Sequence, residues 1–156
     1  MADSAPPSLP ELTREPMRIG EHFGRRMQYD EAQIAEFARL SLDGNPLHRE
    51  GAAARESAFA GVIASGQHTA ALMMGLMASH FTRSDDGVAR EMLCLNVNFS
   101  FKAPVRARTE VDMRWVVSAI EHNKRLGGWV GQLNGSAFSG GTDCVIARAT
   151  VLVKQI

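Results

Sequence analysis

The spacing of apolar residues divides the chain into a helical first half and a strand-rich second half. Residues 93–102, 109–120, 127–138 and 143–156 alternate between apolar and polar positions or are rich in β-branched side chains, which is typical of strands. Turn residues separate these segments: Pro104, Gly127-Gly128 and Gly140-Gly141. The second half therefore predicts four long, mostly antiparallel strands.

In the first half, two helical segments flank a turn. Asp30 is an N-cap candidate for a helix over residues 31–42, where apolar side chains recur at helical spacing. Asn45-Pro46 ends that helix, because the residue before a proline avoids helical angles. A second, short helix is expected over residues 49–57. Asp43 to His48 should thus form an ordered corner between helices.

Residues 65–81 are apolar on almost every side, so we expect a helix that is buried rather than laid on a surface. Together with the strands, and with a weaker strand pattern over residues 17–29, this helix predicts an α+β domain. Its curved antiparallel sheet should wrap around the long central helix. Such a sheet leaves free edges, so we expect a homodimer or a higher homo-oligomer.

The composition fits one domain preceded by a short arm. A chain of 156 residues with 45% apolar residues is the usual size of a single domain, which we place at residues 17–156. The first sixteen residues hold four of the six prolines and little that is apolar. Residues 1–16 are therefore predicted to form a flexible Pro-rich N-terminal arm.

The charge balance and the cysteine content limit the binding partners and the cellular compartment that we expect. Seventeen basic and seventeen acidic residues cancel, so no net field attracts nucleic acid or an anionic membrane. No apolar run is long enough to cross a bilayer, and no early segment has the pattern of a signal peptide. Cys94 and Cys144 form neither a metal-ligand spacing nor a disulfide framework. We expect a soluble cytoplasmic protein without nucleic-acid or membrane partners.

The corner between the first two helices carries a family resemblance. Residues 37–48, with Asp43-Gly44-Asn45-Pro46-Leu47-His48 at their centre, resemble the signature of the MaoC-like, (R)-specific enoyl-CoA hydratases. The similarity continues over residues 59–66 and 99–105, so it covers roughly residues 30–105. The resemblance implies the hot-dog fold. It also implies reversible hydration of trans-2-enoyl thioesters to (R)-3-hydroxyacyl thioesters.

By this resemblance, Asp43 and His48 are the catalytic dyad and Gly66 supplies a backbone amide for the thioester oxygen. The roles suit the chemistry, because hydration needs groups that move protons near one water. An amide at the start of a helix is also suited to a developing oxyanion. The candidate substrate-binding residues are Asn45, Ser65, His68 and Phe99. We expect no metal and no cofactor apart from coenzyme A as part of the substrate, which is a thioester of coenzyme A or of acyl carrier protein.

Each assignment has a structural alternative. Asp43 and His48 are also compatible with a plain turn, and His68 with a hydrogen-bonded core residue. Methionines 73, 74 and 77 suit either core filling or an acyl tunnel. Four cations suit either the phosphates of coenzyme A or solvated strand ends: Arg106, Arg108, Lys124 and Arg125. The sequence also departs from the signature, because Leu42 and Arg108 stand where glycines are usual.

Two other functions fit the same fold. The first is a hot-dog acyl-CoA thioesterase, an enzyme class that commonly carries a carboxylate on the central helix. The absence of Asp and Glu from residues 66–81 disfavours it. The second is a non-catalytic acyl-thioester-binding subunit, which the presence of both Asp43 and His48 disfavours.

Overall fold

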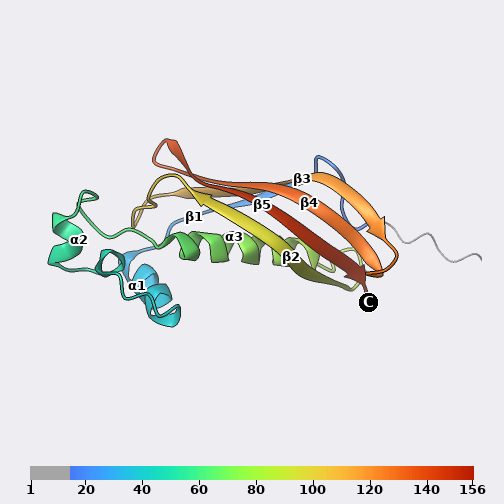
Figure 1. The fold of residues 1–156 in the computed structure, drawn as a ribbon, viewed down its shortest axis with the longest axis horizontal. Helices are drawn as coiled ribbons and strands as arrows, with labels where there is room; N and C mark the ends of the chain where they lie inside the picture. Colours follow the sequence, from blue (N-terminus) through green and yellow to red (C-terminus); the bar gives the residue numbers. More distant parts are fainter. Residues whose placement is uncertain (1–14) are drawn as a thin grey trace, which may run out of the picture.

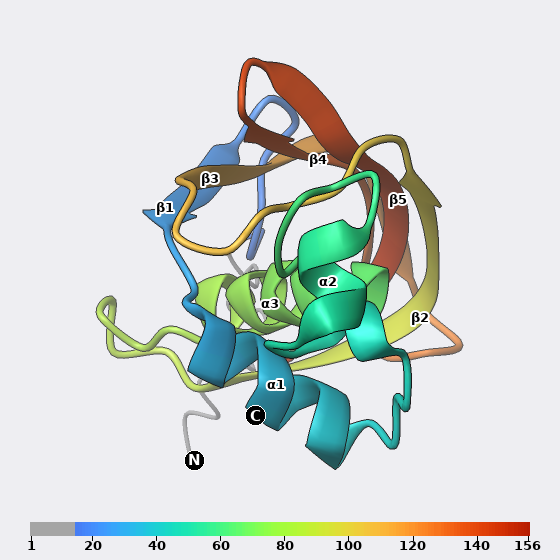
Figure 2. The ribbon, with the colours of Figure 1, turned by 90° about the vertical axis from the view of Figure 1, so that its left-hand side faces the viewer.

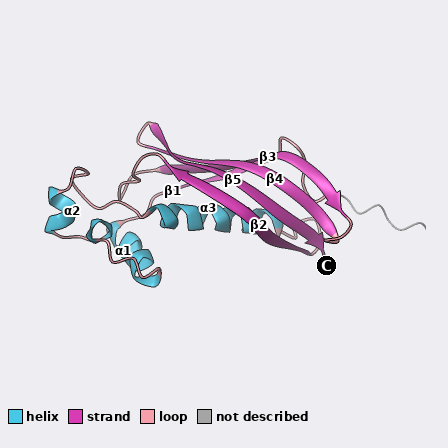
Figure 3. Ribbon diagram, in the orientation of Figure 1, coloured by secondary structure: helices cyan, strands magenta, loops and turns pink. Residues whose placement is uncertain are grey.

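A computed structural model of the chain describes residues 15–156. The arm predicted for residues 1–16 lies almost entirely outside the described residues, so it stays a prediction. The described part contains one sheet, one long helix beneath it and three short helical segments at one end (Figures 1 and 3).

The sheet has five antiparallel strands in the order β1-β3-β4-β5-β2. The strands are β1 (His22–Met27), β2 (Arg90–Phe101), β3 (Val111–Asn123), β4 (Gly128–Ser139) and β5 (Thr142–Gln155). The four long strands agree with the prediction, and β1 is shorter than the segment 17–29 predicted for it. Strands β1 and β2 form the two edges, and each has one neighbour in the described chain.

Alternation along the strands puts one face of the sheet in the core. On β3, Val111, Met113 and Trp115 are buried, whereas Arg114 between them is exposed. Trp115 lies over Gly135 of β4, where a Cβ atom would be only 2.5 Å from the indole ring. Trp115 also donates a hydrogen bond from Nε1 to the carbonyl of Met73, at 2.9 Å. The indole therefore ties the sheet to the helix beneath it.

The long helix α3 (Gly66–Phe81) runs along the concave side of the sheet, which curves over it (Figure 2). Its buried side includes Met73, Met77 and Phe81. The opposite side is exposed at Gln67, Ala71, Gly75 and Ser79, which recur at helical spacing. The helix is thus where the sequence predicts it, but the prediction of all-round burial is wrong for the single chain. The sheet wraps only one side of α3, and the hydrophobic pattern does not reveal how far a sheet will wrap.

Three short segments lie beyond one end of the sheet: α1 (Glu31–Leu40), η1 (Pro46–His48) and α2 (Ala52–Glu56) (Figures 1 and 2). Asp30 caps α1 as predicted. Its carboxylate accepts from the backbone N–H of Gln33, whose side chain accepts from the N–H of Asp30 in return. Helix α1 ends two residues earlier than predicted, and residues 41–45 connect it to η1.

Both cysteines are free thiols in the structure. Cys144 is buried and Cys94 is partly buried, and burial raises the pKa of each thiol. Across residues 15–156, no helix has both the length and the apolar character that crossing a bilayer demands.

Candidate functional site

The corner between α1 and η1 is held by local hydrogen bonds. The side chain of Asn45 accepts from the N–H of Leu47, and Pro46 supplies the first residue of η1. Leu42 has a φ of 58°, the left-handed conformation that favours glycine, and its side chain is 93% exposed. The backbone bend that a glycine usually makes is therefore made here by a leucine.

This corner brings Asp43 and His48 together, as predicted. Oδ2 of Asp43 lies 3.4 Å from Nε2 of His48, and the two side chains are only 16% and 8% exposed. Oδ1 of Asp43 accepts from the N–H of Asn45 at 3.0 Å, so the carboxylate is fixed by its own turn. The imidazole is fixed from the other side, where Nδ1 of His48 lies 2.8 Å from the carbonyl oxygen of Ile63.

The carbonyl of Ile63 assigns the tautomer of His48. A carbonyl oxygen only accepts hydrogen bonds, so Nδ1 must carry a hydrogen and donate it. In the neutral ring, Nε2 then presents a lone pair to the carboxylate of Asp43. Neither group then donates to the other across the 3.4 Å between them, and a water beside the pair has one hydrogen to donate to each.

Gly66 is the first residue of α3, the point at which the first backbone N–H groups of a helix have no partner inside it. The hydroxyl of Ser65 caps the helix by accepting from the N–H of His68 at 3.3 Å. A Cβ atom on Gly66 would lie 2.8 Å from the ring of Phe101, so only glycine fits there without movement. The start of α3 at Gly66 therefore lies against the aromatic ring of Phe101.

A pocket of about 320 Å³ joins the corner to the start of α3. His48, Ser65 and Gly66 are its polar side. Its remaining walls are mainly apolar: Phe59, Ile63, Ala64, Thr69, Phe101, Lys102, Ala103, Pro104, Val105 and Val145. The pocket therefore combines an imidazole and a helix N-terminus with room for an apolar chain.

Not every predicted site residue lines this pocket. Asp43 and Asn45 are in the corner but not in the pocket lining, although Asp43 contacts His48, which is. Phe99 is not in the lining either, but its ring stacks at 6.3 Å between centroids on that of Phe101, which is. His68 also lies outside the pocket lining. The structure thus brings His48, Ser65 and Gly66 together around one cavity, whereas Asp43, Asn45, His68 and Phe99 do not line it.

His68 is buried between two aromatic rings. Its ring stacks on Phe37 of α1 at 4.4 Å between centroids and lies 4.6 Å from the ring of Tyr29. Burial, and secondarily the nearby His48, lowers the pKa of His68 below its usual value. Nδ1 of His68 is the single buried side-chain nitrogen or oxygen without a hydrogen-bond partner in the part of the chain described. His68 is therefore buried where α1 meets α3, but its Nδ1 lacks the hydrogen bond that the core alternative assumes, and its role in substrate binding stays a prediction.

Three residues at this site were given no role from the sequence. Phe101 and Lys102 lie within the resembling segment 99–105, and both line the pocket. Gln67 directly follows Gly66, and its Nε2 lies 3.4 Å from Oδ2 of Asp43. Adjacency to Gly66 was the available signal for Gln67, but its contact with Asp43 depends on how the corner docks against α3.

The cations considered for the phosphates of coenzyme A are largely engaged or distant. Arg108 pairs with Glu31 at 2.8 Å, and Arg106 donates to the carbonyl of Phe59. Lys124 and Arg125 lie in the turn between β3 and β4, at the end of the sheet away from α1 and α2 (Figure 1). These positions favour the alternative that they are structural or solvated side chains.

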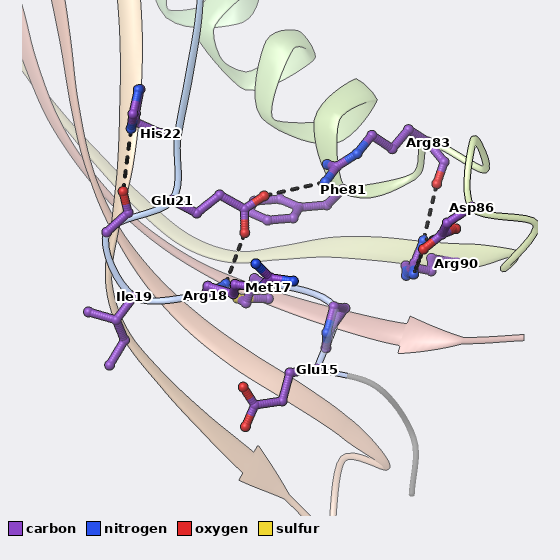
Figure 4. Close-up of a pocket in the computed structure, with 12 residues that line it drawn as sticks. Glu15, Met17, Arg18, Ile19, Glu21, His22, Phe81, Arg83, Asp86 and Arg90 are labelled. Atoms are coloured by element: carbon purple, nitrogen blue, oxygen red, sulfur yellow. Dashed lines mark hydrogen bonds and ion pairs between the residues drawn. The ribbon is translucent and has the colours of Figure 1, made fainter. Parts of the chain in front are cut away.

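A second pocket, of about 530 Å³, lies at the other end of α3 from Gly66 (Figure 4). It lies between residues 15–22 and the segment that follows α3. Glu21 accepts from Nε2 of His80 at 2.7 Å and from Arg83 at 3.4 Å. Burial lowers the pKa of His80 more than Glu21 raises it, so a neutral His80 donates to the carboxylate. Glu21 and its partners attach the start of the described chain to the end of α3.

Comparison with known proteins points to one family. The model of the MaoC-like domain matches residues 14–131. The (R)-specific enoyl-CoA hydratase of Aeromonas caviae is 29% identical over 115 residues, which are 74% of this chain and 81% of that protein. The structure of the A. caviae (R)-hydratase involved in PHA biosynthesis superposes with a TM-score of 0.74, covering 86% of this chain and 96% of that one. A MaoC-like dehydratase from Rhodospirillum rubrum, 26% identical, gives 0.72 with coverage of 90% and 94%.

The helix-in-curved-sheet architecture of the chain is the hot-dog fold, as the resemblance implied. Since the family model covers most of the sequence, the chain belongs to the MaoC-like domain family.

Proposed function

We propose that the protein is a hydro-lyase that reversibly hydrates trans-2-enoyl thioesters to (R)-3-hydroxyacyl thioesters. The observation that carries the proposal is the pair of acceptors at the corner. Nε2 of His48 and Oδ2 of Asp43 lie 3.4 Å apart, beside a pocket that both His48 and Gly66 line. The similarity to the A. caviae (R)-specific hydratase supports the same substrate class and stereochemistry.

The reaction needs a base for water and a proton for the substrate. As the water oxygen bonds to C3 of the enoyl group, the Asp43–His48 pair takes one proton from the water. The same pair gives one proton to C2, so it ends the addition in its starting protonation state. Water is thereby added across the double bond, and the reverse sequence removes it.

The Gly66 amide would act on the thioester oxygen. As the water adds, electron density moves from the double bond onto this oxygen, giving an enolate-like transition state. An N–H at a helix start stabilises such charge, and losing one such donor typically slows a reaction on the order of 100-fold or more. The apolar walls of the pocket would hold the acyl chain, which is carried as a thioester of coenzyme A or of acyl carrier protein.

We also propose that the working form is a homodimer or a higher homo-oligomer. Strand β2 is a long free edge, and it exposes Leu93, Leu95 and Phe101 by 51%, 46% and 54%. The uncovered side of α3 adds small residues that permit close approach. A second copy covering both features would remove an edge and an apolar surface that monomers rarely leave open. Sedimentation equilibrium tests this, and a monomer at micromolar concentration would contradict it.

The catalytic proposal is tested by turnover. Purified protein mixed with crotonyl-CoA and longer trans-2-enoyl-CoAs should remove the absorbance of the conjugated enoyl group without releasing free thiol. In the reverse direction it should dehydrate the (R)-3-hydroxyacyl-CoA, whereas the (S) enantiomer should not react. Thiol release without hydration would instead indicate a thioesterase. Binding of these thioesters without either reaction would indicate a non-catalytic subunit.

A further inference from the structure

Gln67 connects the two halves of the candidate site. It follows Gly66 in the first turn of α3, and its Nε2 lies 3.4 Å from Oδ2 of Asp43. A carboxylate only accepts hydrogen bonds, so the amide of Gln67 is the donor. One residue therefore contacts the acid of the corner while its backbone neighbour is the proposed oxyanion amide.

We propose that Gln67 is a positioning residue that orients Asp43 for proton transfer and fixes the corner relative to Gly66. This inference rests on the proposed hydration. Within residues 15–156, Asp43 accepts from one other donor, the N–H of Asn45, which is bound to Oδ1 at 3.0 Å. That bond restrains one oxygen. The amide of Gln67 restrains the other, which is the oxygen that faces His48.

In the proposed hydration, the contact would also orient the water that Asp43 and His48 share. Oδ2 of Asp43 lies 3.4 Å from each of two nitrogens, the acceptor Nε2 of His48 and the donor Nε2 of Gln67. Both distances are at the long end of the hydrogen-bond range, so Gln67 restrains Oδ2 through a long hydrogen bond. With Gln67 donating from one side, the lone pair of Oδ2 toward His48 stays available to that water.

Stability of the fold alone does not account for this glutamine. Gln67 is exposed in the single chain, and a solvated hydrogen bond contributes little net free energy. Ordering a long glutamine side chain opposes that gain with lost conformational entropy. Geometry at a reacting centre is far more sensitive, because displacement of a group by about 1 Å can cost on the order of 100-fold in rate. The contact therefore matters more for catalysis than for folding.

Two substitutions test the role: one removes the hydrogen-bond donor, and the other replaces it with a negative charge. Gln67→Met keeps the length and removes the donor, so kcat should fall on the order of ten-fold or more with little change in KM. Gln67→Glu places a second carboxylate against Asp43, and two adjacent carboxylates resist being ionised together. We expect a larger fall in kcat and an acid limb of the pH–kcat profile displaced to higher pH. Both variants should keep the thermal stability of the wild type within a few degrees.

Gln132→Glu is the matched control. Gln132 is also exposed, its side chain accepts from Thr150 at 2.8 Å, and it lies on β4 away from the pocket. The control adds the same charge and should leave the kcat and the pH profile unchanged. If the Gln67 variants match the wild type in kcat and pH profile, or if Gln132→Glu shifts the profile as far as Gln67→Glu does, the positioning role is wrong.

A measurement independent of turnover separates this inference from the proposed function. In protein labelled with ¹⁵N at glutamine side chains, Asp43→Asn should shift the amide resonances of Gln67 and leave those of Gln132 in place. Unmoved Gln67 resonances overturn the inference even if hydration is observed. Shifted Gln67 resonances in a protein that hydrates no enoyl thioester would retain the contact and reject the hydratase.

Discussion

Oδ2 of Asp43 and Nε2 of His48 lie 3.4 Å apart because a proline turn reverses the chain between them, and each group is anchored by a backbone atom. The N–H of Asn45 holds the carboxylate, and the carbonyl of Ile63 holds the imidazole. Neither anchor comes from the partner of the pair. Each side chain is therefore expected to keep its place when the other is altered, which makes single substitutions informative.

Asp43→Asn and His48→Gln should each abolish most hydration in a folded protein. Each change keeps the size of the side chain and removes a group that moves protons, a loss typically on the order of 100- to 10,000-fold. The measurement is kcat/KM with crotonyl-CoA, with circular dichroism as the control for folding. Rates near that of the wild type in both variants would leave the corner as a structural turn.

Gly66→Ala should reduce kcat on the order of 100-fold, because the added methyl would lie 2.8 Å from the ring of Phe101 and displace the start of α3. The ring belongs to a side chain that is 54% exposed, so the clash is removable. The double variant with Phe101→Ala should therefore regain activity toward that of Phe101→Ala alone. An undiminished rate in Gly66→Ala would exclude the need for glycine at this position.

Local patterns predict the elements of this fold better than their contacts. The capping box at Asp30, the alternation of β3 and the apolar run of α3 are encoded within a few residues, and all three elements form as expected. The proximity of Asp43 and His48 follows from one short motif. In contrast, the stacking of His68 on Phe37 depends on how α1 docks against α3. No local pattern specifies that docking, so the role of His68 was left open by the sequence.

The same distinction applies to the burial of α3. Its apolar run predicts a helix that avoids water, and the sheet covers one side of it. The hydrophobic periodicity of one chain does not predict what covers Ala71 and Gly75. The stretch is apolar enough to be covered on both sides, which agrees with the proposed assembly with a second copy.

Leu42→Gly should stabilise the fold. Leu42 has a φ of 58° and a side chain 93% exposed, so the leucine bears a left-handed backbone without burying apolar surface. Left-handed angles cost a residue with a side chain on the order of 1 kcal/mol, and glycine avoids most of that cost. The free energy of unfolding from urea titration should rise by up to about 1 kcal/mol.

Leu42→Ala is the control for this prediction, because alanine removes the side chain and keeps the strained angle. It should not stabilise the protein. Equal gains from glycine and alanine would show that the exposed side chain, rather than the backbone angle, carries the cost.

His68→Phe should weaken the dependence of stability on pH. Phenylalanine keeps a flat ring between Phe37 and Tyr29 and removes the unpartnered Nδ1. Burial lowers the pKa of His68 in the folded state, whereas the unfolded chain has the ordinary value of 6.5. Near and below pH 6.5 the unfolded state therefore binds more protons, so the wild type loses stability as the pH falls toward the lowered pKa.

Thermal unfolding at pH 7.5, 6.5 and 5.5 measures this difference. The unfolding temperature of the wild type should fall more between pH 7.5 and 5.5 than that of His68→Phe. His80, whose pKa is also lowered, is present in both proteins, so its contribution cancels in the comparison. Parallel curves would mean that protonation of His68 costs nothing in the fold. They would also mean that its place between two aromatic rings, rather than its charge, is what the structure uses.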